Sequence, residues 1–446
     1  MRRSERWMVG LGLAMGVVSG GLAQDANDLT PSRARALFDE AKQQCDADGG
    51  KLWGRSLCGP MMIVEPATRR VSANAPDRYN ALVEEHGVFI GRLPEGETIA
   101  NTSVEWSGVK WVQVQWPMPT DAVQQRVLMA HESFHRVQAE LGLEAKGEQS
   151  NGHLDELQGR YLLQLEWRAL AAALKANDDA TIRAHARDAL MFRDRRYATF
   201  PQARAAERSL ERNEGLAEYT GIMIGGSDPS ERTALALHDL SSHVADPSFV
   251  RSFAYATGPA YGLLLDRYAP DWRVQIREQA DETPASLLAM ALKVSASATQ
   301  ADAQLAVRAK AYDGATLLAG ETKRAAERER ELATYRNKFV QSPILVLPLS
   351  NPRVMFDPRN LVAMGAAGTV YPSAKFVADW GSLEVRDGAL LAGDWSKVQV
   401  PRALAAPGQH GTIGDKGWTL VLADGWQIVP GERDGDVTVK RVAQTP

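Results

Sequence analysis

The sequence predicts an α+β protein in which an N-terminal β-sheet precedes a long helical region and a β-rich domain follows them. Residues 57–118 carry short apolar runs and alternating segments that are typical of strands. Apolar residues then recur at helical spacing to about residue 341, and short apolar runs separated by turn residues return after it. This order predicts four segments, at 1–23, 24–119, 120–341 and 342–446.

The composition is that of a globular chain without a strong overall charge. Of 446 residues, 44% are hydrophobic and 24% are charged, with 51 basic against 55 acidic side chains. A net charge of −4 gives no field that would attract nucleic acid or an anionic membrane, so we expect neither as a partner.

The first segment, residues 1–23, has the pattern of a secretory signal peptide. Arg2, Arg3 and Arg6 precede an uncharged, largely apolar run, and small residues stand at the positions that a signal peptidase reads, up to Ala23. The apolar run is shorter than the roughly 20 residues that cross a bilayer. We therefore expect a cleaved signal, a periplasmic or secreted protein, and no stable membrane span after cleavage.

Cys45 and Cys58 are separated by twelve residues and are the two cysteines of the chain. In an oxidising compartment this pair is predicted to form a disulfide that closes a short loop, with two separate buried thiols as the alternative. Two cysteines cannot form a cysteine-ligated zinc or iron–sulfur site. Any metal must therefore be held by histidine and carboxylate side chains.

The elements follow from local patterns. An amphipathic helix is expected at 29–48, and the Ser107-Gly108 pair is expected to turn the chain between two alternating strands. After Pro117 and Pro119, Thr120 or Asp121 can cap a helix that runs to about Leu143. Further helices are predicted at 154–174, 203–224, 254–268, 285–292 and 323–338, the last as a solvated helix with i,i+4 ion pairs. Further strands are predicted at 61–64, 87–90, 344–349, 369–371, 383–385 and 419–422.

The helix after the predicted sheet contains the pattern His-Glu-x-x-His, formed by His131, Glu132 and His135. Residues four apart lie on one helix face, so both imidazoles can turn toward one ion. Glu132 lies beside them, where its carboxylate can reach a metal-bound water. Two surface histidines on an amphipathic helix are the structural alternative. A di-iron bundle would need a second Glu-x-x-His, which the chain lacks.

A catalytic zinc needs a third protein ligand and an open position for water. Gln138 and Leu141 occupy the positions of the glycine and third histidine of the short metzincin pattern, which excludes that class. Carboxylates downstream of the motif remain as candidates for the third ligand. They are Asp155, Glu156, Glu166, Glu214 and Glu218.

The segment Asn213-Glu214-Gly215-Leu216-Ala217 resembles the Asn-Glu-Gly-x-Ala segment of gluzincin zinc metallopeptidases, distantly of the aminopeptidase-N-like enzymes. The resemblance covers roughly residues 105–265 and implies a zincin-like catalytic core with Glu214 as the third ligand. Glu218 would then lie behind the ligands or be a solvated helix carboxylate. Glu214 follows His135 by 79 residues (135 to 214), so a helical insertion must separate the two halves. Asp155, 20 residues after His135 (135 to 155), is the alternative ligand.

Tyr255 lies in a Tyr-x-x-Gly segment that ends at Gly258. This segment is similar to one that follows the third ligand in aminopeptidase-N-like enzymes, where the tyrosine hydroxyl supports the tetrahedral intermediate. The resemblance gives that role to Tyr255, with Tyr261 as the alternative. Without a catalytic role, a tyrosine in an apolar helix would be a residue of the core.

Together these features predict an exported peptide-bond hydrolase that uses one Zn²⁺ per chain and acts on a peptide or protein substrate. His131, His135 and Glu214 would hold the metal, Glu132 would act as general base and Tyr255 would stabilise the oxyanion. The family's Gly-x-Met-Glu-Asn segment, which binds a substrate amino terminus, is missing. Its absence favours an endopeptidase over an aminopeptidase. A non-catalytic binding protein on a zincin scaffold is the remaining alternative.

Overall fold

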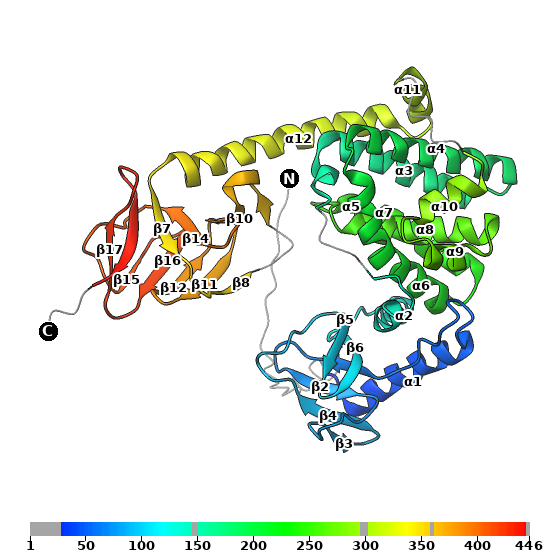
Figure 1. The fold of residues 1–446 in the computed structure, drawn as a ribbon, viewed down its shortest axis with the longest axis horizontal. Coiled ribbons are helices and arrows are strands. Elements are labelled where there is room, and N and C mark those ends of the chain that lie inside the picture. The colour runs from blue at the N-terminus through cyan, green and yellow to red at the C-terminus, as the bar shows by residue number, and fades with distance from the viewer. Residues whose placement is uncertain (1–27, 145–149, 295–301, 357–360, 443–446) are drawn as a thin grey trace, which may run out of the picture. The chain divides into compact units, whose positions relative to one another are not determined.

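The computed structural model describes residues 28–144, 150–294, 302–356 and 361–442. The predicted signal peptide, 1–23, lies outside the described residues. The chain divides into two compact units, Met1–Tyr312 and Asp313–Pro446. An N-terminal sheet, a helical middle and a C-terminal β region confirm the predicted α+β class (Figure 1).

The sheet of the first unit has the strand order β3-β4-β2-β1-β6-β5. Only β1 and β6 pair in parallel, and the other neighbours are antiparallel. Strand β5 pairs with β6 and forms one edge of the sheet. The strands are β1 Met61–Val64, β2 Arg70–Ala73, β3 Val83–Glu85, β4 Val88–Arg92, β5 Thr102–Trp106 and β6 Val109–Gln115.

Helix α1 (Pro31–Asp48) and helix α2 (Ala122–Gln138) pack on one face of this sheet. Phe38 of α1, Val112 of β6 and Met129 of α2 share one buried apolar cluster. Cys45, in the last turn of α1, forms a disulfide with Cys58, which confirms the predicted bridge. The bridge ties α1 to the loop that leads into β1.

Ser107 and Gly108 form the predicted turn between β5 and β6, both with positive φ. The carboxylate of Asp77 holds this turn, since it accepts hydrogen bonds from the Ser107 hydroxyl at 2.5 Å and from the backbone N–H of Leu82 at 2.9 Å. Burial by itself would raise the pKa of Asp77. The hydrogen bonds from Ser107, Ala81, Leu82 and Tyr79 outweigh burial and lower this pKa to about 2.

Helix α2 lies between the sheet and the helices that follow it (Figure 1). Asp121 caps its N-terminus by accepting from the Gln124 N–H at 2.9 Å, as predicted, but the helix ends at Gln138, before Leu143. Helix α6 (Leu216–Gly225) packs closely on α2, because a Cβ on Gly221 would lie 2.7 Å from the Val127 carbonyl oxygen. The remaining helices of the unit are α3 Leu157–Lys175, α4 Asp179–Thr199, α5 Ala203–Leu210, α7 Pro229–Ser242, α8 Ser252–Tyr268, α9 Trp272–Glu278, α10 Pro284–Ala291 and α11 Asp302–Lys310.

A buried ion network joins α3, α4 and the segment after α5. Arg193 binds Glu166 at 2.8 Å and Glu211 at 2.6 Å, while Arg196 binds Glu166 and Glu207, both at 2.7 Å. Each guanidinium pairs with two carboxylates that are buried with it, and removing one partner of a buried ion pair is costly. The network therefore fixes the helices that precede Glu214.

The second unit begins with α12 (Gly314–Arg336), which is mostly exposed and carries the i,i+4 pair Lys323–Glu327 at 3.9 Å. Two sheets follow, with strand orders β17-β18-β7-β14-β13-β10-β9 and β15-β16-β12-β11-β8, around a core that includes Trp380 and Trp418. No described helix has the length and apolar character needed to cross a membrane. The strands are β7 Ile344–Pro348, β8 Arg353–Phe356, β9 Val362–Ala363, β10 Thr369–Tyr371, β11 Ala374–Ala378, β12 Gly381–Val385, β13 Ala389–Leu391, β14 Lys397–Pro401, β15 Thr412–Gly414, β16 Trp418–Leu422, β17 Trp426–Pro430 and β18 Val437–Arg441.

Candidate metal centre

Three side chains that could hold a metal ion meet in the first unit: His131 and His135 of α2, and Glu214. The Nε2 atoms of the two histidines are 3.1 Å apart, and they lie 3.5 Å and 3.4 Å from Glu214 Oε2. Donor atoms around a tetrahedral zinc, each at about 2.0–2.1 Å, are about 3.3–3.4 Å from one another. The three donors thus lie at the separations of one tetrahedral face.

Glu214 reaches the histidines from an irregular segment. The helix predicted over 203–224 is interrupted by a π-helical turn, Glu211–Gly215, which contains Glu214. Such turns displace the following residues around the helix axis and are frequent at functional sites. The interruption separates α5 from α6, so Glu214 faces α2 while α6 packs along it.

Helix α8 crosses this π turn at very short range. A Cβ on Gly258 would lie 2.1 Å from the carbonyl oxygen of Gly215, so only glycine fits at 258 without movement of the backbone. The close crossing brings Tyr255, one turn before Gly258, to the carboxylate of Glu214. The Tyr255 hydroxyl donates a hydrogen bond to Glu214 Oε2 at 2.8 Å.

The second ring nitrogen of each histidine has its own partner. His131 Nδ1 lies 2.7 Å from Glu218 Oε2, and His135 Nδ1 lies 2.8 Å from Gln138 Oε1. The Gln138 amide nitrogen donates to two backbone carbonyls, of Arg212 at 3.0 Å and Asn213 at 3.1 Å, which leaves its oxygen to accept from His135. Both Nδ1 atoms are therefore donors, and both Nε2 atoms are available for a metal.

Buried charges set the protonation of this centre. Burial by itself would lower the pKa of His131, but hydrogen bonds to Glu214 and Glu218 raise it to about 10. Burial would likewise raise the pKa of Glu214, yet His131 and His135 hold it well below the usual range. In the metal-free site, His131 is therefore protonated and Glu214 is ionised. A metal cation bound there would replace that proton.

Glu132 lies beside the three donors without being one of them. It is 4% exposed, and its Oε2 atom has no hydrogen-bond partner among the described residues. Burial raises the pKa of this carboxyl, and the nearby imidazoles of His131 and His135 oppose that rise. A buried carboxylate oxygen without a partner is rare and costly, and a water molecule bound next to the three donors would satisfy it.

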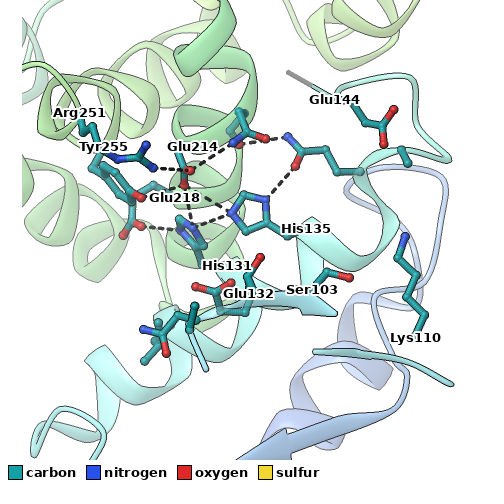
Figure 2. Close-up of a pocket in the computed structure, with 17 residues that line it drawn as sticks. Ser103, Lys110, His131, Glu132, His135, Glu144, Glu214, Glu218, Arg251 and Tyr255 are labelled. Carbon is teal, nitrogen blue, oxygen red and sulfur yellow. Dashed lines mark hydrogen bonds and ion pairs between the residues drawn. The ribbon is translucent and has the colours of Figure 1, made fainter. Parts of the chain in front are cut away.

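Further side chains hold Glu214 from the side away from α2. Arg251 reaches Glu214 Oε1 at 3.3 Å, and the Asn213 amide donates to the same oxygen at 3.1 Å. The ring of Tyr255 stacks on that of His131, with centroids 5.6 Å apart and planes 3° from parallel. Figure 2 shows these contacts around the carboxylate.

The alternative residues lie elsewhere. Asp155 accepts hydrogen bonds from the Ser248 hydroxyl at 2.8 Å and the Phe249 N–H at 3.1 Å, and it is not among the gathered donors. Tyr261 is fully buried and donates to Glu166 at 2.7 Å, inside the ion network. Glu214 and Tyr255, not Asp155 and Tyr261, are therefore the residues that accompany the histidine pair.

The side chain of Arg136, the residue after His135, attaches α2 to the loop that precedes β1. Its guanidinium donates to the Cys58 carbonyl at 2.8 Å. This bond attaches α2, the helix of His131 and His135, to the disulfide-closed loop before β1. The loop, α1 and α2 therefore form one connected layer behind the histidines.

The donors line a cavity of about 910 Å³. Its other walls include residues 100–103, before and within β5, and Lys110 of β6 (Figure 2). Gln138, Lys110 and Arg251 are site residues that local sequence patterns did not identify. Gln138 stands three residues after His135, on the same helix face, which is the one signal that could have indicated it.

Comparisons of the chain with models of protein families, with curated proteins and with solved structures give no match. The arrangement of side chains around the cavity is thus the basis for any assignment of function. It consists of a candidate metal site with three donors, an adjacent carboxylate oxygen that has no partner among the described residues, and an opening lined by a strand edge.

Proposed function

We propose that this protein is an exported, zinc-dependent hydrolase of peptide bonds. The observation that carries the proposal is the buried, unpartnered carboxylate of Glu132 beside His131, His135 and Glu214. Two imidazoles and one carboxylate at tetrahedral separations match the protein ligand set of catalytic zinc sites, which keep one position open.

His131, His135 and Glu214 would hold the ion. When bound, zinc supplies Lewis-acid chemistry, because it withdraws electron density from oxygen atoms of water and of the substrate carbonyl. Glu218 and Gln138 keep the two imidazoles in the tautomer that presents Nε2. Arg251 and Asn213 orient the Glu214 carboxylate through its other oxygen, Oε1.

Glu132 acts as general base and then as general acid. Its carboxylate takes a proton from a water molecule as that water attacks the peptide carbonyl carbon. The C–N bond then breaks, and Glu132 returns the proton to the departing amine. In this structure Tyr255 donates its one hydroxyl proton to Glu214 Oε2. In the reaction the hydroxyl would leave that carboxylate and donate instead to the carbonyl oxygen, where negative charge develops.

The strand edge supports a peptide as the substrate. Strand β5 has a neighbour on one side only, and residues at and before its start line the cavity. An extended peptide can add to such an edge by backbone hydrogen bonds, whatever its side chains. This arrangement would lay the peptide beside Glu132.

Incubation of zinc-loaded protein with a mixed peptide library, followed by mass spectrometry, tests the proposal. We expect cleavage by the wild type and a loss of about 10²–10⁴ in rate for Glu132→Gln, with zinc content unchanged. Tyr255→Phe should lose about 10²–10³, as when one oxyanion donor is removed. Tyr261→Phe, which alters a tyrosine outside the cavity, is the matched control. Peptides bound but not cut would instead favour a binding protein.

A further inference from the structure

Lys110 of β6 lines the cavity from the sheet side. In the β5–β6 register, Lys110 lies opposite Glu105, and Val112 lies opposite Ser103. Residues 110 and 112 lie on the same face of β6, and Val112 packs in the cluster that contains Met129 of α2. The Lys110 side chain therefore projects toward α2 and the metal-binding histidines. In Figure 2 it lies on the side of the cavity away from Arg251 and Tyr255.

The Lys110 ammonium has no ion pair or hydrogen bond with any described residue, although the side chain is half-buried. Glu105 stands directly across the strand pair and Glu144 lines the same cavity, yet neither lies within 4.0 Å of the ammonium. Arg251, another cation of the cavity wall, already binds Glu214. Among the described residues of this wall, Lys110 is thus the cation without a partner, whereas Arg251 contributes one guanidinium nitrogen to Glu214.

The rest of the wall offers little to a large apolar side chain. The apolar residues of the lining are Ala100, Leu128 and Ala139, and the others are polar, charged or aromatic with a hydroxyl group. Selection between peptides therefore depends on polar contacts. A carboxylate at the Lys110 ammonium would form a charge-assisted hydrogen bond, which is stronger than a neutral one.

We propose that Lys110 recognises a carboxylate of the substrate. The substrate class is then a peptide with an Asp or Glu side chain, or a free C-terminus, close to the bond that is cut. This inference rests on the proposed peptidase function and specifies the substrate of that site.

Matched peptides test it. One series contains Asp or Glu against Asn or Gln at each position beside the cleaved bond, and a second compares free with amidated C-termini. For wild type we expect kcat/KM to be about tenfold higher for the acidic member, as for a charged hydrogen bond of about 1.4 kcal/mol. The first series identifies a side-chain carboxylate, and the second identifies the C-terminus.

Variants of Lys110 test whether this side chain causes the preference for acidic peptides. Lys110→Gln should remove the acidic preference, and Lys110→Glu should reverse it toward peptides with Lys or Arg. Lys175→Gln, at an exposed lysine in the last turn of α3, should leave the preference as in wild type. An acidic preference that survives Lys110→Gln, or no acidic preference in wild type, would overturn the inference.

The failure of catalysis is a separate result. If wild type cuts none of the peptides, the proposed function fails, and the same pairs are then compared by fluorescence anisotropy with zinc-loaded protein. Tighter binding of acidic peptides that is lost in Lys110→Gln would still support carboxylate recognition. Equal binding of both members by wild type would refute it.

Discussion

Replacing Gln138 with methionine should weaken zinc binding although no donor side chain is changed. Methionine has a similar length but can neither accept from His135 Nδ1 nor donate to the carbonyls of Arg212 and Asn213. Loss of a partner behind a metal-binding histidine typically costs about 10–100-fold in affinity, or about 1.4–2.7 kcal/mol.

The three hydrogen bonds of Gln138 have separable effects. The two bonds to carbonyls are present in the metal-free structure and involve no metal donor. Their loss should therefore lower the free energy of unfolding, by about 1–3 kcal/mol for buried polar groups left without partners. The bond to His135 fixes the tautomer and the ring orientation, so its loss should appear in the zinc dissociation constant.

Competition with a fluorescent zinc chelator at neutral pH measures the dissociation constant, and urea unfolding of the metal-free protein measures stability. Gln124→Met is the matched control, since Gln124 lies in the first turn of the same helix and outside the cavity wall. A Gln138→Met protein that is less stable but has the wild-type dissociation constant would refute the positioning role of Gln138.

Glu214→Ala should remove bound zinc from the purified protein while Asp155→Ala retains it, as measured by metal analysis, and the reverse result would make Asp155 the ligand. Asp77→Asn should destabilise the fold by about 1–3 kcal/mol at neutral pH. Because folding lowers the pKa of Asp77 from 3.8 to about 2, its contribution is complete above pH 3.8 and disappears as the pH falls through 2. The unfolding free energies of wild type and Asp77→Asn should therefore become equal as the pH falls to about 2. Replacement of Cys45 and Cys58 together by serine should cost about 3 kcal/mol in unfolding free energy, the loop entropy of a bridge of this span. An unchanged midpoint in urea would contradict that estimate.

The parts of the centre that sequence could predict depend on local spacing or on a recognisable segment. His131 and His135 share a helix face because they are four residues apart, and the structure brings them together. Glu214 could be predicted only from the resemblance of its segment to a known one, because it lies 79 positions after His135 (135 to 214). The π turn that contains it was not predicted, because the segments on both sides of it are helical and 203–224 was predicted as one continuous helix.

The residues that sequence analysis missed act through contacts between distant segments. Lys110 faces the cavity because of the register between β5 and β6, and Arg251 reaches Glu214 because α8 crosses the π turn. Arg136, which follows the second histidine, donates to the Cys58 carbonyl, a contact that sequence spacing does not indicate. The order of an N-terminal sheet, a helical middle and a C-terminal β region, by contrast, followed from periodicity and turn residues, and the α+β class is confirmed.

The crossing of Gly258 over Gly215 also limits how this site can vary between related sequences. The two backbones are in direct contact with no side chain between them. The distance between Tyr255 and Glu214 is therefore set by the backbones, and no side-chain change at the crossing can adjust it. A methyl group at 258 would displace the axis of α8 and carry Tyr255 and Arg251 away together. A substitution of Gly258 would therefore break the contacts of both Tyr255 and Arg251 with Glu214, although every residue of the His-Glu-x-x-His pattern stayed the same. Homologues with an intact motif but a larger residue at 258 should be expected to have lost the tyrosine contact.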